Sequence, residues 1–304
     1  MSALPPSGRV ISVDPNVIVD GGEWRFSGAV GTFRRLVRNP LSAFGLLVLV
    51  LLLLVAIFAP LLAPSDPDAF NGAAKFMPPS AQHFFGTDNV GRDIFSRVLF
   101  GARYSLIAAV VILTIAAVLG TIVGLIAGYA GGWVDEALMR ITDMFLAFPA
   151  LILAMVVAAA LGPSLFNATA AIAIVWWPWY ARLVRGQVLQ LKNEPFVAVV
   201  RLSGASRVRI LTSHLLRNCT TPIIVQMALD LGFAILTLAA LSFIGLGAQA
   251  PTPEWGSMIS TGRDFYLTQW WLVAFPGLSI FLAVVAANLL GDGLQDALSP
   301  HLDQ

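Results

Sequence analysis

Long apolar runs without a charged residue constrain this chain more than any other feature of its sequence. Residues 41–63 ("LSAFGLLVLVLLLLVAIFAPLLA") carry no charge, and a helix needs only about 20 such residues to cross the hydrocarbon core of a bilayer. The 304-residue chain is 58% hydrophobic and only 12% charged, a balance that a water-soluble surface does not allow. The sequence therefore predicts an all-α integral membrane protein.

Further apolar runs predict five more membrane-spanning helices, at residues 106–129, 141–161, 165–181, 220–247 and 270–290. Gly162 and Pro163 separate the third helix from the fourth, because both residue types interrupt helices. The first run begins after residue 40 and is longer than the apolar core of a signal peptide, about 7–15 residues, so we expect a permanent anchor. Residues 1–40 resemble a loosely ordered tail.

The positions of Lys and Arg predict the orientation of the six helices. Thirteen of these residues fall on the side of the amino terminus and five on the opposite side, and the richer side stays in the cytoplasm. Both termini are therefore expected to be cytoplasmic. The predicted parts are a cytoplasmic tail (1–40), a first span (41–63), an extracytoplasmic segment with an interfacial helix (64–104), a core of five spans (105–298) containing a cytoplasmic loop (192–217), and a short cytoplasmic tail (299–304).

A polar stretch at residues 83–97, "HFFGTDNVGRDIFSR", lies between the first two predicted spans. Asp93 can cap a helix that begins at Ile94. Apolar residues on one side of that helix, with Ser96 and Arg97 turned away from them, predict a helix at the membrane surface. Three glycines would allow the turns that return the chain to the bilayer: Gly86, Gly91 and Gly101. His83, Asp88 and Asp93 match no metal-loop spacing, so the stretch is interpreted as architecture.

The predicted cytoplasmic loop has the pattern of a short helix, a glycine break and a second helix. Pro195 and Glu194 suit a helix start, Gly204 suits a left-handed stop, and Ser206 can cap the next helix. Helical spacing places one set of residues on a shared face: Phe196, Val199, Val200 and Ser203. This face lies either on the bilayer or under the chain's own helices, with nearby arginines facing anionic lipid, or it lies against a cytoplasmic protein. The pattern alone does not choose.

Chemistry-bearing motifs are sparse. The histidines are His83, His214 and His301, and the sequence has neither an H-E-x-x-H nor a G-x-S-x-G pattern, so we expect no catalytic residue and no metal site. It also lacks the G-x-x-x-x-G-K-[ST] loop that cradles nucleotide phosphates. Asp230 falls inside the fifth predicted span and is either a satisfied packing contact or part of a translocation path.

Two other patterns inside the predicted spans allow more than one interpretation. Gly120, Gly124 and Gly128 would let another helix approach closely, either within the chain or from a partner. Trp176, Trp177 and Tyr180 near the predicted end of the fourth helix are typical of an aromatic belt, with lining of a path as the alternative.

Five segments in this order resemble the inner-membrane permease subunits of ATP-binding cassette importers for dipeptides, oligopeptides and related solutes, of the second-permease type. They are "HFFGTDNVGRDIFSRVLFGARYSL" (83–106), "GYAGGWVDEALMRITDMFLAFPAL" (128–151), "GASRVRI" (204–210), "LSFIGLGAQAPTPEWGSM" (241–258) and "FPGLSIFLAVVAANLLGDGLQDAL" (275–298). Residues 161–175 and 242–249 look nearest to the D-alanyl-D-alanine dipeptide branch. Opines, glutathione and nickel chelates use similar permeases.

The resemblance implies the six-span type I importer permease fold, in a bacterial inner membrane, and a coupling loop that docks in a cleft of a cytoplasmic ATPase. Carried over by position, the loop comprises Glu194, Phe196, Ala198, Val199, Val200, Gly204, Ala205 and Ser206. The family's Glu-Ala-Ala signature falls on Ala198, Val199 and Val200, a change that keeps a small apolar face.

The partners implied are a homologous second permease, two cytoplasmic ATPase subunits and an extracytoplasmic solute-binding protein, with the lipid bilayer around them and no nucleic acid. ATP and magnesium would bind the ATPase subunits, and no cofactor would bind this chain. The stretch at residues 83–97 becomes a candidate surface for the binding protein. The alternative is a stand-alone transporter driven by an ion gradient, which would need charges near the bilayer midplane; only Asp230 qualifies, and no internal repeat is evident.

Overall fold

A computed structural model describes residues 24–298, with side chains from residue 31 onward. The expected tail at residues 299–304 and the first 23 residues of the expected amino-terminal tail lie outside this part. Within it the chain is helical and contains no strand, only an isolated bridge between Thr87 and Asp93. The expected all-α class is confirmed.

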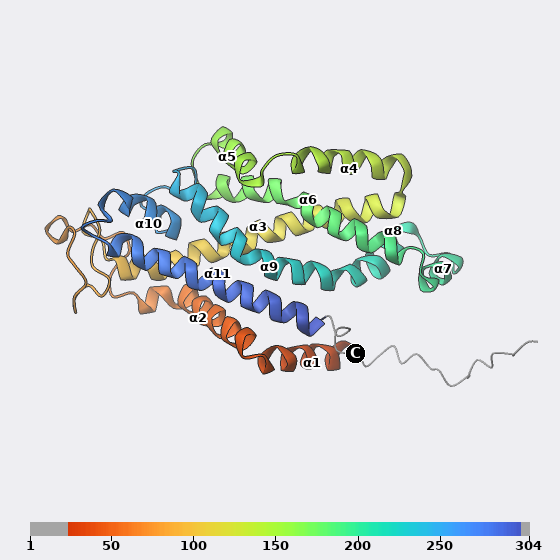
Figure 1. Ribbon diagram of the computed structural model, residues 1–304, viewed down its shortest axis with the longest axis horizontal. Helices are drawn as coiled ribbons and strands as arrows, with labels where there is room; N and C mark the ends of the chain where they lie inside the picture. Colours follow the sequence, from red (N-terminus) through yellow and green to blue (C-terminus); the bar gives the residue numbers. More distant parts are fainter. Residues whose placement is uncertain (1–23, 299–304) are drawn as a thin grey trace, which may run out of the picture.

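The helices run mostly along the long axis of the molecule and alternate in direction (Figure 1). One end holds the segment before α3 together with α10; the other holds α7 and α8. We call these the α10 end and the α7 end. The elements are α1 (Trp24–Arg38), α2 (Pro40–Leu62), η1 (Gly72–Ala74), α3 (Ile94–Ala130), α4 (Gly132–Leu146), α5 (Ala150–Leu161), α6 (Leu165–Leu191), α7 (Pro195–Leu202), α8 (Arg207–Arg209), the π-helical turn η2 (Ile210–Leu215), α9 (Leu216–Phe243), α10 (Trp255–Gly262), η3 (Arg263–Phe265) and α11 (Trp271–Leu298).

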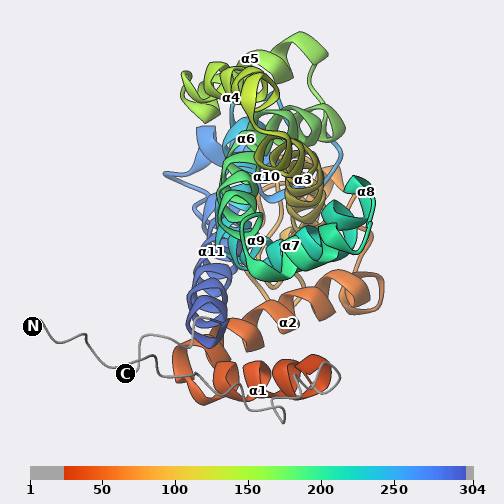
Figure 2. The ribbon, with the colours of Figure 1, turned by 90° about the vertical axis from the view of Figure 1, so that its right-hand side faces the viewer.

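The pair α3 and α6 forms the most extensive helix contact. A Cβ atom added at Gly120 would lie 2.5 Å from the Trp177 carbonyl oxygen, and one at Gly124 would lie 2.5 Å from the Ala181 carbonyl oxygen. These glycines therefore let the two backbones approach closely. The sequence left the partner of this glycine face open, and the structure places it within the chain, on α6. Seen along the long axis, α4 and α5 lie on one side of this pair and α1 and α2 on the other (Figure 2).

The buried apolar residues form two clusters that follow each other along the molecule. The cluster nearer the α10 end includes Ile112, Ile172, Leu238 and Trp255, and we call it the α10-side cluster. The second, the α7-side cluster, includes Tyr180, Val184, Val188, Val197, Ile210 and Leu215. Trp176 and Met227 pack against both clusters, so they mark the seam between them.

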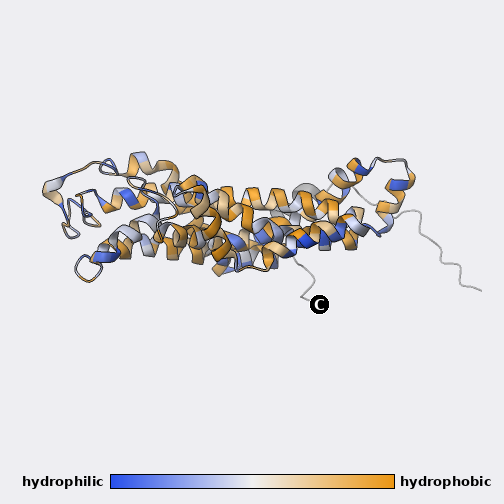
Figure 3. Cartoon of the chain, turned by 90° about the horizontal axis from the view of Figure 1, so that it is seen from above, coloured by the Kyte–Doolittle hydropathy of each residue, from blue (hydrophilic) through white to orange (hydrophobic). Residues whose placement is uncertain are grey.

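Four helices are long and apolar enough to cross a membrane: α2, α3, α9 taken together with α8 and η2, and α11. The pair α4 and α5 would add a fifth crossing, although it bends by 87° at the break between the helices. By the same measure α6 does not qualify, so the six expected spans are not all recovered. Hydrophobic residues dominate the middle of the molecule, and hydrophilic ones gather toward its two ends (Figure 3).

Several predicted helix bounds were too short. The second predicted span and the surface helix before it are one continuous helix, α3, and the fourth and sixth spans extend to Leu191 and Leu298. Polar residues at helix ends can remain helical when neighbouring helices pack against them, whereas the sequence estimate counted only apolar residues. The fifth span was placed too late, because α9 begins at Leu216 and ends at Phe243.

Two other predictions gave the wrong type of structure. The third predicted span, residues 141–161, is broken between Leu146 and Ala150, and Pro149 precedes α5 as its N-cap residue. Part of the supposed loose tail is helical, because α1 covers Trp24–Arg38. Basic residues lie in the last turn of α1, where they complement the helix dipole.

Candidate functional site

The segment between α6 and α9 has the helix, glycine, helix pattern that its sequence predicts. Pro195 lies in the first turn of α7, and Glu194 precedes it as the N-cap residue, without a side-chain hydrogen bond to the helix. Gly204 has a φ of 79°, in the left-handed region that glycine adopts at little cost. The Ser206 hydroxyl accepts a hydrogen bond from the Arg209 backbone N–H at 3.3 Å and caps α8.

One face of this segment is anchored in the α7-side cluster. Val197 is fully buried there, and Val200 and Ala205 are partly buried against the same cluster. The sequence left open whether the face with Phe196, Val199 and Val200 lies under the chain's own helices or against other molecules. The structure divides that face: Val200 packs under the chain's own helices, whereas Phe196 and Val199 stay exposed.

The opposite face of the segment is apolar and exposed. The exposed fractions are 39% for Phe196, 61% for Val199, 88% for Leu202 and 68% for Val208. We call these four residues the α7 patch; the small residue Ala198 is exposed beside them. Leu202 and Val208 were missed from the sequence, although Leu202 follows Val199 at the helical spacing of three. Grouped large apolar side chains at the surface mark contact sites.

Charged side chains surround the α7 patch without pairing to one another. Arg201, Arg207, Arg209 and Glu194 are exposed, and none forms an ion pair with any residue from 31 to 298. An apolar centre with a charged rim is the usual composition of a protein interface. The residues predicted for coupling therefore lie together at one end of the molecule, with Val200 and Ala205 beneath them.

Asp230 on α9 is hydrogen-bonded by residues of two helices. The Tyr180 hydroxyl on α6 donates to Oδ2 at 2.8 Å, and the Gln226 amide, one turn earlier on α9, donates to Oδ1 at 3.0 Å. We call these three residues the Asp230 cluster. The predicted aromatic-belt position of Tyr180 was wrong, because α6 continues to Leu191 and Tyr180 is fully buried near its middle. The expected packing contact of Asp230 is thus present, and its other interpretation, a role in a path, is not decided by these bonds.

The polar stretch at residues 83–97 builds the α10 end. Asp93 caps α3, since its carboxylate accepts a hydrogen bond from the Ser96 backbone N–H at 2.8 Å. Ser96 and Arg97 are not turned outward as predicted: they are 0% and 4% exposed. Gly101 makes no turn, because it lies inside α3, where an added Cβ atom would be 2.6 Å from Trp255 Cδ1. Gly86 and Gly91 do adopt positive φ values.

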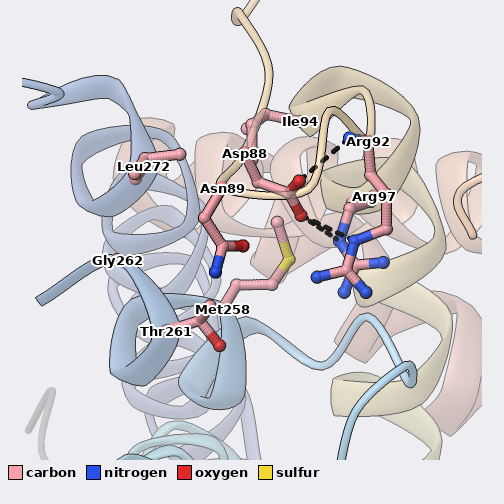
Figure 4. A pocket seen from close by; sticks show the side chains of 9 residues that line it. All are labelled: Asp88, Asn89, Arg92, Ile94, Arg97, Met258, Thr261, Gly262 and Leu272. Carbon is pink, nitrogen blue, oxygen red and sulfur yellow. Dashed lines mark hydrogen bonds and ion pairs between the residues drawn. The ribbon is translucent and has the colours of Figure 1, made fainter. Parts of the chain in front are cut away.

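Arg97 connects three segments that are distant in the sequence. Its guanidinium donates to the Pro67 carbonyl at 2.8 Å, to the Asp68 carboxylate at 3.1 Å and to the Pro251 carbonyl at 3.0 Å. Asp88 lies 4.0 Å from Arg97 and 2.6 Å from Arg92 (Figure 4). The cavity beside these side chains has a volume of about 20 Å³, close to that of one water molecule, so it excludes a solute.

The start of α10 closes the same end of the molecule. Glu254 accepts hydrogen bonds from the Gly256 and Ser257 backbone N–H groups, at 2.9 Å each, and caps α10. Burial raises the pKa of the Glu254 carboxyl, and these hydrogen bonds oppose that shift. Trp255 Nε1 donates to the Val98 carbonyl at 3.0 Å. Together with Arg97 and Asp88, Glu254 and Trp255 form what we call the α10 network.

Within the part of the chain that the structure describes, no group of three or more His, Cys, Asp or Glu side chains is arranged to hold a metal ion. His83 Nδ1 lies 2.9 Å from Asp93 Oδ1. The other carboxylate oxygen of Asp93 caps α3.

Comparisons with known proteins converge on membrane transport. Residues 120–304 match the sequence profile of the binding-protein-dependent transport system inner membrane component. Residues 30–79 match the N-terminal transmembrane domain of oligopeptide transport permease C.

Three similar proteins carry related names. A probable D,D-dipeptide transport system permease protein of Escherichia coli (strain K12) is 47% identical over 291 residues, covering 96% of this chain and 97% of that protein. A dipeptide transport system permease protein of Alkalihalophilus pseudofirmus is 46% identical over 298 residues, covering 98% and 94%. A di/tripeptide transport system permease protein of Pseudomonas aeruginosa is 44% identical over 264 residues, covering 85% and 87%.

Proposed function

Since this chain belongs to the family of inner membrane components of binding-protein-dependent transport systems, we propose that it moves di- or oligopeptides from a binding protein into the cytoplasm. It is a multi-pass inner membrane protein and a permease subunit of an ATP-binding cassette importer. Members of this family form the inner-membrane component of the transport system and are not its catalytic subunit. ATP hydrolysis would therefore take place on two cytoplasmic ATPase subunits, which would also bind the ATP and magnesium.

The proposed topology has six crossings with both termini in the cytoplasm. The helices that meet the length and hydropathy criteria provide four of them, and the bent pair α4 and α5 provides a fifth. We assign the sixth to α6, which packs along α3 over most of its length. Its arginines are neutralised by α4: Arg185 lies 2.5 Å from Asp135, and Arg182 lies 2.6 Å from Asp143. Paired charges reduce the cost of placing α6 in a membrane.

In this topology the parts predicted from the sequence keep their order. Residues up to 40 face the cytoplasm and include α1, residues 41–63 form the first span, and residues 64–104 lie outside or at the outer surface. Residues 105–298 form the core with the coupling loop at 192–217. The α7 end is then cytoplasmic and the α10 end extracytoplasmic, where the binding protein would dock.

The observation that carries the proposal is the α7 patch. Four large apolar side chains stay exposed at an end of the molecule where arginines are also exposed, and Leu202 is 88% accessible. Apolar side chains with arginines around them suit either the bilayer surface or a protein cleft, and membership of a family of ATP-driven importers favours the cleft. We infer that an ATPase subunit covers this patch, with Gly204 and Ser206 setting the angle between α7 and α8. The exposed apolar residues of α2 and α3 would face lipid or the homologous second permease.

Transport in a reconstituted system tests the proposal. The chain is co-expressed with the permease, ATPase and binding-protein genes that accompany it, purified through a tag on this chain, and placed in proteoliposomes. We expect the ATPase subunits to co-purify, and uptake of labelled alanyl-alanine to require ATP and binding protein. Recovery of the chain alone, with uptake that ignores ATP and follows a proton gradient, would establish the ion-driven alternative instead.

A further inference from the structure

The carboxylate of Asp230 has no cationic partner. It lies near the middle of α9, one of the helices apolar enough to span the membrane. No Lys, Arg or His from residue 31 to residue 298 forms an ion pair with it. An ionisable side chain inside a membrane helix is costly, and such residues usually face a partner charge or a path for a solute or ion. A cation from outside the described residues would therefore complete the surroundings of Asp230.

The surroundings of Asp230 are arranged for a negatively charged carboxylate. Each of its two oxygens accepts one hydrogen bond from a neutral donor, the Tyr180 hydroxyl at 2.8 Å and the Gln226 amide at 3.0 Å. A carboxylate oxygen can accept a second hydrogen bond, so each retains an unused acceptor position. Two donors orient the group without supplying a positive charge. The cluster therefore presents an oriented carboxylate with free acceptor capacity.

Asp230 also lies in a stretch of α9 that is only partly buried. Residues 225–231 are all partly buried, a run of nearly two helical turns without one fully buried side chain. On either side of this run, Ile223 and Gly232 are buried. Met227, within the run, packs against both apolar clusters, so the run spans the seam between them. Asp230 is therefore partly accessible at the boundary between the two clusters.

We propose that the Asp230 cluster is a transit contact for the α-ammonium group of the transported peptide. This proposal rests on the proposed function, since it takes the solute to be a peptide. An ammonium group carries three N–H donors and a positive charge, which complement the two free acceptor positions and the uncompensated charge of the carboxylate. Tyr180 and Gln226 act as positioning residues that hold the carboxylate toward the seam.

The first test uses the wild-type transporter with all membrane and ATPase subunits but without the binding protein, so that only the permease selects the solute. The probes are an alanyl dipeptide whose second side chain carries a photoreactive diazirine, and the same dipeptide acetylated at its amino group. We expect the free-amino probe to label α6 and α9 near residues 176–180 and 226–230, and the acetylated probe to label them at least about tenfold less, the loss expected for a hydrogen bond to a charged group. Equal labelling by both probes, or no labelling of this region, would overturn the proposal.

The second test uses substitutions in the complete transporter with its binding protein. Asp230→Asn keeps the shape and removes the carboxylate, and we expect uptake of alanyl-alanine to fall roughly tenfold. Asp230→Glu should restore most of the uptake. Asp292→Asn, at an exposed carboxylate on α11, is the matched control and should leave uptake unchanged.

The outcomes separate this proposal from the proposed function. Uptake by Asp230→Asn within twofold of wild type would overturn the ammonium contact while the transporter remains a peptide importer. Labelling of a lysine or arginine of the second permease by an Asp230-directed crosslinker would overturn it as well, by identifying a different cation. If the transporter with Asp230→Asn fails to assemble, the photolabelling of the wild-type transporter decides whether the proposal holds. Absence of any ATP-dependent uptake by the wild type would instead contradict the function itself.

Discussion

The two ends of the molecule differ in how far their side chains are buried and paired. At the α10 end, charged and aromatic groups are buried and paired: Arg97 bonds to three segments and Trp255 donates to the backbone of α3. At the α7 end, Leu202 and Val208 remain exposed and the neighbouring arginines have no ion-pair partner within residues 31–298. The first end pairs its polar groups within one chain, whereas the second leaves an apolar patch exposed, which we propose an ATPase subunit covers.

This difference also separates stability from function. A buried, paired charge costs several kcal/mol when its partner is removed, but an exposed apolar side chain contributes little to the folded state of its own chain. Substitutions at the α10 end should therefore reduce the stability of the protein. Substitutions at the α7 end should leave stability nearly unchanged and reduce coupled transport.

The largest effect is expected for Arg97→Ala. The change leaves the carbonyls of Pro67 and Pro251 without their donor and removes the ion pair with Asp68, so unfolding of the detergent-solubilised protein should become easier by about 3–5 kcal/mol. Arg103→Ala is the matched control, because Arg103 is an arginine of the same helix that is exposed and unpaired among the described residues. Chemical denaturation followed by tryptophan fluorescence measures both. Equal losses for the two variants would remove the distinction between a structural and a peripheral arginine.

Gly101→Ala should have the next largest effect. The added Cβ atom would lie 2.6 Å from Trp255 Cδ1 and 2.8 Å from the Pro253 carbonyl oxygen, so α10 must shift and stability should fall by about 1–3 kcal/mol. Gly186→Ala, on α6 toward the α7 end, meets no atom within 4 Å and should be neutral or gain up to about 1 kcal/mol from helix propensity. The same denaturation measurement applies, and a neutral Gly101→Ala would show that the α10 network is more plastic than its contacts indicate.

A smaller and more local effect is expected at Gly204. Its φ of 79° is costly for alanine, so Gly204→Ala should destabilise the turn between α7 and α8 by about 1–2 kcal/mol. Gly204→Asn should cost less, because asparagine enters the left-handed region more easily. Hydrogen–deuterium exchange of α7 would report the change, with faster exchange in the alanine variant. Identical exchange in both variants would argue that the left-handed turn does not hold α7 in place.

Leu202→Ser should have the smallest effect on stability and a large one on coupling. Leu202 is 88% exposed, so unfolding should change by less than about 0.5 kcal/mol. If an ATPase cleft covers the α7 patch, however, ATP-driven uptake should fall by about tenfold or more, the loss typical of one interface hot spot. Leu267→Ser, at an exposed leucine of the α10 end with 83% accessibility, is the matched control. Normal uptake and ATPase recovery in Leu202→Ser would contradict the assignment of the patch.

Local features could be predicted well from the sequence because they depend on neighbouring residues. Asp93 and Ser206 cap the helices that follow them, and Gly204 adopts the left-handed conformation. A cap or a turn requires only groups within about four residues, which the sequence displays directly. The resemblance of the motif series to a permease family was likewise confirmed by the comparisons.

Features that depend on distant residues were predicted less well. Ser96 and Arg97 were expected to point away from the packed side of the helix, but Pro67 and Pro251, far away in the sequence, surround Arg97. Helical spacing groups Val200 with Val199 on one face, but it does not reveal that Val200 packs on a cluster that contains Val197, Ile210 and Leu215. The break between α4 and α5 was missed because the apolar pattern continues across it.

The sequence by itself determined that the chain is a helical membrane protein of the permease family, because hydrophobic length, helix caps and motif order are properties of the linear chain. Only the tertiary structure decided which polar groups are structural and which remain available. Arg97 lies in a polar stretch and Asp230 in an apolar run, but neither sequence context shows which groups the side chain meets in the fold. The fold surrounds Arg97 with oxygen acceptors and leaves Asp230 with neutral donors and no cation, because burial and pairing are set by helices that meet only when the chain is folded.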